Sequence, residues 1–273
     1  MTDQSVKILE RAHTKHDPVM IYAGMSGGRD SLAVTHLTME WADRHGYPAK
    51  VLHLNTGIGI EKTRQFVRDV CKQQGWPLLE VRAKEDCGQD YEQLVLEHGF
   101  PGPSHHTKMY NRLKERGVEY AVRKAKEGHS RMRRVLISTG IRAEESAKRS
   151  GYNRVEHRRG GQVWLNPIYR WTSNQRDAYI DRHDLPINPV SKVLGMSGEC
   201  LCGAYAHKGE KDLVRIVDPA TAEYIDDLEQ RVKDRGFPWG WEHPGPPRRW
   251  LLEREGQMNA FQPLCTGCGK SNE

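Results

Sequence analysis

The sequence lacks any apolar stretch of the ~20 residues that a transmembrane helix needs, and residues 1–17 lack the apolar core of a secretory signal peptide. It also lacks internal repeats and low-complexity tracts, which argues against a solenoid or a fibrous protein. These absences predict a soluble cytoplasmic protein with no membrane partner.

The composition is polar, with 29% charged and 37% apolar residues and a mean hydropathy of −0.78. Strand-like apolar runs nevertheless recur through the first two thirds of the chain, so we do not expect global disorder. A chain of 273 residues can bury a sizeable core. Its length favours one α/β domain with an appended C-terminal tail.

The net charge is positive, at +6, with a pI near 9.0. Arginine and lysine cluster at 131–134, 142–159 and 248–249. Such clusters suit a polyanionic partner, but they are also ordinary solvated surface, and a nucleotide site needs positive charge as well. Nucleic-acid binding therefore stays open at this point, as does oligomerisation.

Six cysteines are present, in a chain too large to depend on disulfide staples. Four of them form two close pairs, Cys200 with Cys202 and Cys265 with Cys268, and this spacing is typical of metal ligands. Cys71 falls in an expected helix and Cys87 follows an expected strand, so we interpret both as packing residues.

Apolar runs alternate with helical patterns along the chain. The sequence predicts strands at 19–23, 50–54, 77–82, 134–140 and 162–168, and helices at 30–45, 61–74, 172–183 and 219–234. The helix at 172–183 opens on Thr172-Ser173-Asn174-Gln175, which resembles a capping box. A helical stretch over 90–126 is interrupted by a turn-rich segment at 99–106. Strand and helix alternation of this kind predicts an α/β fold with an open parallel sheet of about five strands and helices on both faces.

A glycine-rich turn connects the first expected strand to the first expected helix. Glycine lets the backbone approach a ligand closely, and the helix N-terminus offers unpaired N–H groups to an anion. The turn lacks the Lys-Ser/Thr ending of a Walker P-loop, and it fits instead the Ser-Gly-Gly-x-Asp-Ser template of the pyrophosphatase loop, or PP-loop. The matching residues are Ser26, Gly27, Gly28, Arg29, Asp30 and Ser31.

Four further segments follow in the order found in one known family. They are Leu54-Asn55-Thr56-Gly57 with Glu61-Lys62-Thr63, then 138–146 with Arg149, then 167–172, and finally Leu185-Pro186-Ile187-Asn188-Pro189. From about residue 19 to residue 206 the chain resembles the phosphoadenosine phosphosulfate (PAPS) reductase-like family of the PP-loop, adenine nucleotide alpha hydrolase-like superfamily. Asn55 departs from the family pattern, which has an aspartate there.

The resemblance implies a PP-loop domain at 1–206 and a C-terminal extension at 207–273. It implies that ATP, PAPS or adenosine phosphosulfate (APS) binds at the loop, with Mg²⁺ as a further cofactor. Asp30, Arg142, Glu145 and Arg149 would be catalytic, Asp30 supporting the loop or the magnesium and the arginines pairing with phosphate or sulfate. The nucleotide-binding set would be Ser26, Gly27, Gly28, Arg29, Asp30, Ser31, Thr56, Gly57, Gly140, Arg142 and Ser146.

Cys200 and Cys202 fall where iron–sulfur members of the family carry their downstream cysteine pair. The adjacent cysteines expected earlier in those members are missing, and His105-His106 stands roughly in their place. We expect Cys200, Cys202, Cys265 and Cys268 to form one four-thiolate site that closes the tail onto the domain. Four soft ligands suit either a [4Fe–4S] cluster or Zn²⁺, and two separate metal-free pairs are the alternative.

Two other groups of residues have a functional and a structural interpretation. His105 and His106, near Lys108 and Arg112, would form either a basic edge to a substrate entrance or an exposed loop. Trp239, Trp241 and Trp250 would either stack on a nucleobase or pack the tail onto the core.

Three functions remain open on the sequence. The first is an ATP pyrophosphatase-type enzyme that adenylates an acceptor, in sulfur transfer or nucleic-acid modification, with a nucleic acid or a sulfur donor as partner. The second is reduction of PAPS or APS to sulfite with a thioredoxin-like donor. It is weakened by the absence of the family's Glu-Cys-Gly tail and would need Cys265 or Cys268 as nucleophile. The third is a non-catalytic nucleotide-sensing or nucleic-acid-binding module, and Asn55 in place of the family's acid is its main support.

Overall fold

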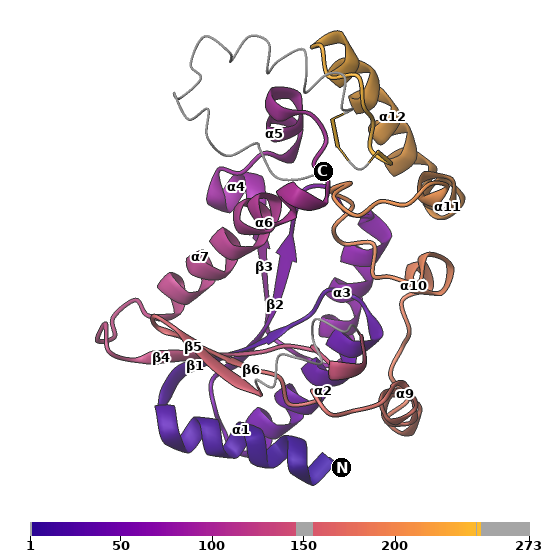
Figure 1. Ribbon diagram of the computed structural model, residues 1–273. Helices are drawn as coiled ribbons and strands as arrows, with labels where there is room; N and C mark the ends of the chain where they lie inside the picture. Colours follow the sequence, from indigo (N-terminus) through magenta and orange to yellow (C-terminus); the bar gives the residue numbers. More distant parts are fainter. Residues whose placement is uncertain (1, 146–154, 244, 247–273) are drawn as a thin grey trace, which may run out of the picture.

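The computed structural model describes residues 2–145, 155–243 and 245–246 (Figure 1). Its centre is a six-stranded sheet in the order β3-β2-β1-β4-β6-β5. The strands are β1 (Pro18–Gly24), β2 (Ala49–Asn55), β3 (Leu78–Arg82), β4 (Arg134–Ser138), β5 (Glu156–Arg159) and β6 (Gln162–Leu165). All neighbouring pairs are parallel except β5 with β6.

The expected α/β class and the five expected strands are confirmed. The strand that the sequence pattern missed is β5, whose residues are all polar or charged and have no apolar face to signal a strand. It pairs antiparallel with β6 at the edge of the sheet.

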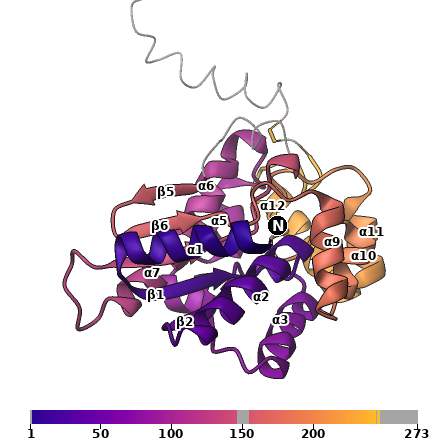
Figure 2. The ribbon, with the colours of Figure 1, turned by 90° about the horizontal axis from the view of Figure 1, so that it is seen from below.

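Helices cover both faces of the sheet. On one side lie α1 (Thr2–His16), α2 (Arg29–Arg44) and α3 (Glu61–Gln73), and on the other lies α7 (Arg116–Ala125) (Figures 1 and 2). Alternate residues of β1 explain this division, because Ile21 and Ala23 pack in the cluster with α1 and α2 while Tyr22 packs against α7. The Tyr22 hydroxyl donates to the Ala121 carbonyl at 3.1 Å.

A further group of elements stands beyond the carboxyl ends of β2 and β3 (Figure 1). It comprises α4 (Ala83–Cys87), α5 (Tyr91–His98), η1 (Pro103–His105), α6 (His106–Tyr110), η2 (Asn111–Glu115), α10 (Pro189–Leu194), α11 (Glu210–Val217) and α12 (Pro219–Asp234). Residues of α5 and α12 share one hydrophobic cluster with Trp239 and Trp241, both of which are buried. The packing interpretation of these two tryptophans is therefore confirmed, whereas a domain boundary near 206 stays a prediction.

The expected helix at 172–183 is α9 (Ser173–Arg182), and its N-terminus carries the capping box that the sequence predicted. Thr172 accepts a hydrogen bond from the Gln175 backbone, and the Gln175 side chain accepts one from the Thr172 backbone. The short η3 (Ala143–Glu145) precedes the first gap in the described residues.

The segment that carries Cys200 and Cys202 is fixed on the loop between β2 and α3. The Leu201 amide donates to the Ile58 carbonyl at 2.8 Å, and the Ile60 amide donates to the Gly198 carbonyl at 2.9 Å. Gly59 lies between these two bonds, where a Cβ atom would be 2.4 Å from the Glu199 carbonyl oxygen. Only glycine allows the two backbones to come this close.

We therefore expect Gly59→Ala to lower the free energy of unfolding by about 1–3 kcal/mol, because the new methyl group meets backbone that cannot rotate away. Urea denaturation followed by circular dichroism measures this. An unchanged unfolding midpoint would contradict the close approach.

Candidate functional site

The turn after β1 leads directly into the N-terminus of α2. Gly28 is the N-cap of this helix, and no side chain caps the first backbone N–H groups. The Ser31 hydroxyl closes the loop by accepting from the Ser26 amide at 3.1 Å and donating to the Gly28 carbonyl at 2.8 Å. The loop thus leaves N–H groups and the Ser26 hydroxyl at the end of a 16-residue helix.

Gly27 gives the loop its shape. It has a φ of +81°, and a Cβ there would be 2.7 Å from the Thr63 side chain. Asn188 holds this backbone, because its amide nitrogen donates to the Gly27 carbonyl at 3.1 Å and to the Thr63 hydroxyl at 3.0 Å. The Asn188 oxygen also accepts from the Val190 amide and so caps α10. One buried side chain therefore connects the loop, α3 and α10.

The Asp30 carboxylate holds two arginines. Arg142, in the loop after β4, donates to it through Nε, and Arg176 of α9 donates to it at 3.2 Å. The Arg142 guanidinium is 4% exposed and also donates to Glu144 at 2.8 Å. Asp30 therefore anchors the loop to two other elements, and contact of Arg142 with a phosphate stays a prediction.

Gly140 lets the chain after β4 reach the loop. A Cβ at this position would lie 2.6 Å from the Asp30 backbone carbon. β4 is the strand on the opposite side of β1 from β2, so the loop lies at the point where the strand order reverses. Ligands of open α/β sheets bind at such a point, outside the carboxyl ends of the strands.

A cleft of about 760 Å³ opens at this point. Three cationic side chains line it, namely Arg29, Arg176 and Lys192, and Asp30 is the one carboxylate among its described lining residues. Arg29 and Arg176 also pair with Asp177 at the rim, at 3.6 and 2.8 Å. The full lining is Ser26, Gly28, Arg29, Asp30, Ser31, Gly140, Ile141, Arg176, Ser191, Lys192, Gly195, Met196 and Ser197.

The structure thus brings together Ser26, Gly28, Arg29, Asp30, Ser31 and Gly140 of the predicted set, while Gly27 shapes the loop from behind. The sequence analysis missed Arg176 and the stretch 191–197. One available signal for 191–197 was the Leu-Pro-x-Asn-Pro segment between α9 and α10, because residues 191–197 directly follow this family motif. No motif contains Arg176, and the sequence indicated only that it lies in the helix that begins after the Thr172 capping box.

Thr56 and Gly57 do not line the cleft. Thr56 is buried, and it binds Glu199 twice: its hydroxyl donates to the Glu199 carbonyl at 2.8 Å, and its amide donates to the carboxylate at 3.1 Å. Gly57 has a φ of +79°, and its amide donates to the Asn55 side chain. The role of both residues in nucleotide binding stays a prediction, and what the structure shows is that they position the Glu199 segment.

Asn55 stands where the family has an acid, and its surroundings explain the amide. Its nitrogen donates at 2.8 Å to Glu80, which also binds Arg68. Arg68 and then Asn55 lower the pKa of Glu80 to about 2, against the opposing effect of burial. A carboxylate at position 55 would face a second carboxylate instead of donating to it.

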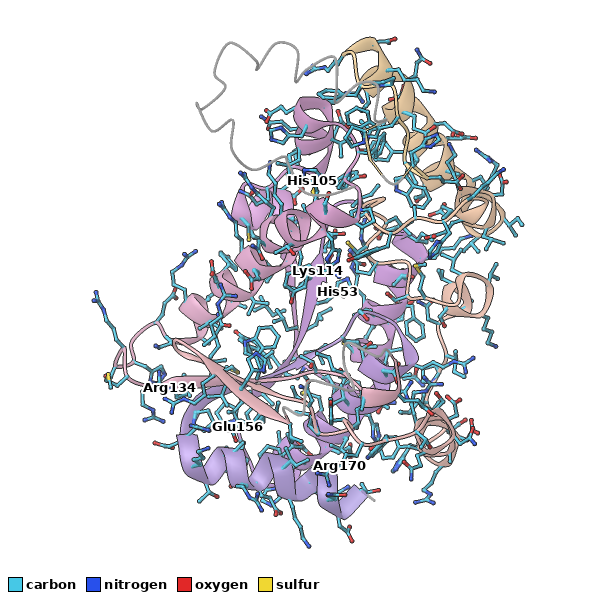
Figure 3. The ribbon with its side chains drawn as sticks, in the orientation of Figure 1. His53, His105, Lys114, Arg134, Glu156 and Arg170 are labelled. Atoms are coloured by element: carbon cyan, nitrogen blue, oxygen red, sulfur yellow. The ribbon has the colours of Figure 1, made fainter. Side chains whose placement is uncertain are left out.

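Cys200 and Cys202 lie at the centre of the protein, near Lys114 of η2. The Cys200 and Cys202 thiols hydrogen-bond to each other, and this bond lowers the pKa of Cys200. The nearby Lys114 ammonium lowers it further, whereas burial opposes the shift. Behind them, His53 and Arg64 face the Glu199 carboxylate at 3.3 and 3.7 Å. Figure 3 shows His53 and Lys114 between the sheet and the helices above it. Two adjacent thiols of this kind suit a soft metal.

Several predicted site residues lie outside the described residues: Ser146, Arg149, Cys265 and Cys268. Glu145 ends η3, directly before the gap. The four-thiolate site therefore stays a prediction. Within the described residues no cluster of three or more histidine, cysteine or acidic side chains has metal-binding geometry. Helices long and apolar enough to cross a membrane are likewise absent from that part of the chain.

The family model that matches this sequence is the phosphoadenosine phosphosulfate reductase domain, over residues 20–192. The chain belongs to this family. The match runs from β1 to α10 and so contains the loop, Asp30, Arg142, Arg176 and Lys192. The recognition made from the sequence is confirmed, and with it the PP-loop fold.

Two curated proteins are similar to this chain. An uncharacterized protein of Methanocaldococcus jannaschii is 26% identical over 87% of this chain and 47% of its own length. An adenosine 5'-phosphosulfate reductase of Burkholderia cepacia is 24% identical over 67% of this chain and 68% of its own. The chain thus spans about half the length of the Methanocaldococcus protein.

Solved structures with similarity include a PAPS reductase of Candida auris, at 18% identity and a TM-score of 0.49. The match covers 69% of this chain and 84% of that one. A [4Fe–4S] U34-tRNA thiolase of Methanococcus maripaludis has 16% identity and a TM-score of 0.47, covering 98% and 80% of the two chains.

We expect Asn55→Asp to destabilise the protein at pH 7 by about 1–2 kcal/mol, because two carboxylates then share one site. Their mutual repulsion raises a folded-state pKa above its unfolded value. The loss should therefore be present at neutral pH and diminish as the pH falls through that raised pKa. Urea denaturation across pH 4–7 measures it, and Asn55→Asp with Glu80→Gln should restore stability. Equal stability of wild type and Asn55→Asp at pH 7 would contradict this explanation.

Asp30→Asn should lower the free energy of unfolding by about 3 kcal/mol, because it leaves the buried Arg142 guanidinium paired only with the half-exposed Glu144 carboxylate. The matched control is Asp177→Asn, whose pairs lie at the partly exposed rim, and there we expect a change below about 1 kcal/mol. Thermal and urea unfolding of both variants measure the difference. If the free energy of unfolding falls by a similar amount in both variants, Asp30 does not hold the loop to Arg142 and Arg176 in the way described.

Proposed function

We propose that this chain is an enzyme that binds ATP at the PP-loop and uses it to adenylate an acceptor. The observation that carries the proposal is the cleft itself. An uncapped helix N-terminus, two hydroxyls and the side chains of Arg176 and Lys192 face one cavity. Donors and charges of this kind are suited to a polyphosphate.

In this proposal an acceptor oxygen attacks the α-phosphorus of ATP, and the bond to the β-phosphate oxygen breaks, so that pyrophosphate leaves. Negative charge then grows on the leaving group. The loop N–H groups with Ser26 and Ser31 would hold that group, and Lys192 and Arg176 would neutralise its charge. Asp30 would act as a positioning residue, because it fixes Arg176 through a salt bridge.

Magnesium would neutralise the triphosphate further. The described lining does not fit a metal ion held by the protein alone, because its one carboxylate, Asp30, already binds two guanidinium groups. We therefore propose that Mg²⁺ enters the cleft bound to the nucleotide and that Asp30 does not hold the metal. This revises the expectation that Asp30 supports a magnesium ion.

Reduction of a sulfonucleotide is the second candidate, and the family match and the Burkholderia relative favour it. It requires a thiol that attacks sulfur. None of the described residues that line the cleft is a cysteine, and Cys200 and Cys202 face Lys114 instead. The nucleophile would have to come from Cys265 or Cys268.

A binding module without turnover is the third candidate. Asn55 no longer supports it, because the hydrogen bond from the Asn55 side chain to Glu80 explains why an amide stands at position 55.

For the four-cysteine site we propose a [4Fe–4S] cluster or Zn²⁺, held by Cys200 and Cys202 together with Cys265 and Cys268. The thiols of Cys200 and Cys202 hydrogen-bond to each other, which lowers the pKa of Cys200 and raises the pKa of Cys202. The pair is thus placed to act as adjacent ligands, with one thiol ionising before the other. An adenine nucleotide is the proposed ligand of the loop, and a sulfur donor is a further proposed partner.

The test is exchange of labelled pyrophosphate into ATP by anaerobically purified protein, with and without candidate acceptors. We expect exchange by the wild type and a loss of about a hundredfold in Lys192→Ala, because a charge aimed at the leaving group is removed. Lys50→Ala, at the amino-terminal end of β2 and so away from the cleft, is the matched control and should keep the wild-type rate. Sulfite release from PAPS or APS with reduced thioredoxin, without pyrophosphate exchange, would overturn the proposal in favour of the reductase.

A further inference from the structure

A second cavity, of about 380 Å³, lies away from the PP-loop, between α5, η1 and α6 on one side and Phe237, Trp239 and Pro246 on the other. Its apolar wall includes Phe100, Met109, Phe237 and Trp239. The Trp239 ring is held in place, because its Nε1 donates to the Phe100 carbonyl at 2.9 Å and Phe237 packs edge-on at 5.3 Å. Trp239 is itself only 3% exposed, so the ring that the cavity offers for stacking is that of the half-buried Phe237, which Trp239 holds in place.

The same cavity has cationic and imidazole side chains at its rim. His98, His105, Lys108 and Arg112 line it, together with one carboxylate, Glu97. His105 and Lys108 are exposed, and Figure 3 shows His105 above Lys114, by α6. An aromatic wall with a mostly basic rim is complementary to a ligand that has a flat apolar part and an anionic part. A nucleotide has both.

Exposed aromatic rings stand beside these basic residues. Tyr110 of α6 is 39% exposed and Tyr205 is 55% exposed. His106 packs between them, with ring centroids 4.8 Å from Tyr205 and 6.2 Å from Tyr110. Because these rings lie outside the cavity, a ligand of one nucleotide would leave them unused. Aromatic platforms interleaved with cationic side chains are typical of surfaces that bind single strands.

We propose that this cavity and the adjoining rings of His106, Tyr110 and Tyr205 bind a single-stranded nucleic acid, with one unpaired nucleotide inside the cavity. A cavity of this size accommodates a base and its sugar. Lys108, His105 and Arg112 contact the phosphates, and Tyr110 and Tyr205 stack on neighbouring bases. This names the acceptor class of the proposed adenylyl transfer and in that respect rests on it, although binding itself requires no ATP.

The experiment measures binding of fluorescein-labelled twelve-nucleotide oligouridine and oligodeoxyuridine, which differ only in the sugar, to the full-length protein by anisotropy, without ATP. A duplex of the same length is the comparison. We expect both single strands to bind more tightly than the duplex. Phe237→Ala and Lys108→Glu should each weaken single-strand binding by about tenfold, the first through lost stacking and the second through a reversed phosphate contact.

Lys50→Glu is the matched control, since it reverses an exposed lysine at the amino-terminal end of β2, away from the cavity, and should keep wild-type affinity. Phe237 is only half-buried, and circular dichroism confirms that Phe237→Ala folds. Photo-crosslinking of a 4-thiouridine strand, read by mass spectrometry, should label residues 97–113 or 237–246.

Absence of single-strand binding overturns the inference, and so do equal affinities of Lys108→Glu and Lys50→Glu, or crosslinks confined to the basic loop at 126–134. If any of these results is found while the protein still exchanges pyrophosphate into ATP, the nucleic-acid inference fails and the proposed adenylyl transfer remains. If the cavity binds single strands but the protein does not exchange pyrophosphate, the inference holds and the adenylyl transfer fails. A strong preference for one of the two strands identifies the sugar of the natural ligand.

Discussion

The candidate site depends on a single carboxylate. Asp30 belongs to the first turn of α2, yet its two partners come from the loop after β4 and from α9, more than a hundred residues further along the chain. Because the Arg142 guanidinium is almost fully buried, its charge has to be compensated within the protein. The same interaction directs Arg176 into the cleft. Folding of the sheet and assembly of a cationic phosphate site are thus coupled through one side chain.

A second constraint positions the opposite wall of the cleft. Asn188 binds the loop backbone and Thr63, and Thr56 binds Glu199, so residues 188–202 are held along α3 and the end of β2. This segment supplies Lys192 and Ser197 to the cleft and continues to Cys200 and Cys202. The proposed nucleotide site and the thiol pair therefore lie on one continuous segment, with Glu199 facing His53 and Arg64 behind it.

The sequence predicted the parts of this structure that depend on local pattern. Apolar runs located the parallel strands, the glycine-rich turn located the loop, and the Thr172 capping box located the start of α9. It could not locate β5, since four polar residues at a sheet edge carry no periodic apolar signal. Arg176 and Lys192 were missed because their place in the cleft is set by tertiary contacts. The sequence also could not predict that Asn55 hydrogen-bonds to Glu80, because only the pairing of β2 with β3 brings the two residues together.

Membership of the PAPS reductase family accounts for the fold and the loop, while the chemistry depends on what the cleft holds. The central claim is that ATP binds with its phosphates between the loop and residues 191–197. Hydrogen–deuterium exchange of the protein with and without MgATP tests this most directly. The account predicts slower exchange of the amides at 26–31 and 191–197 on addition of nucleotide. Unchanged exchange in both segments at saturating MgATP would contradict it.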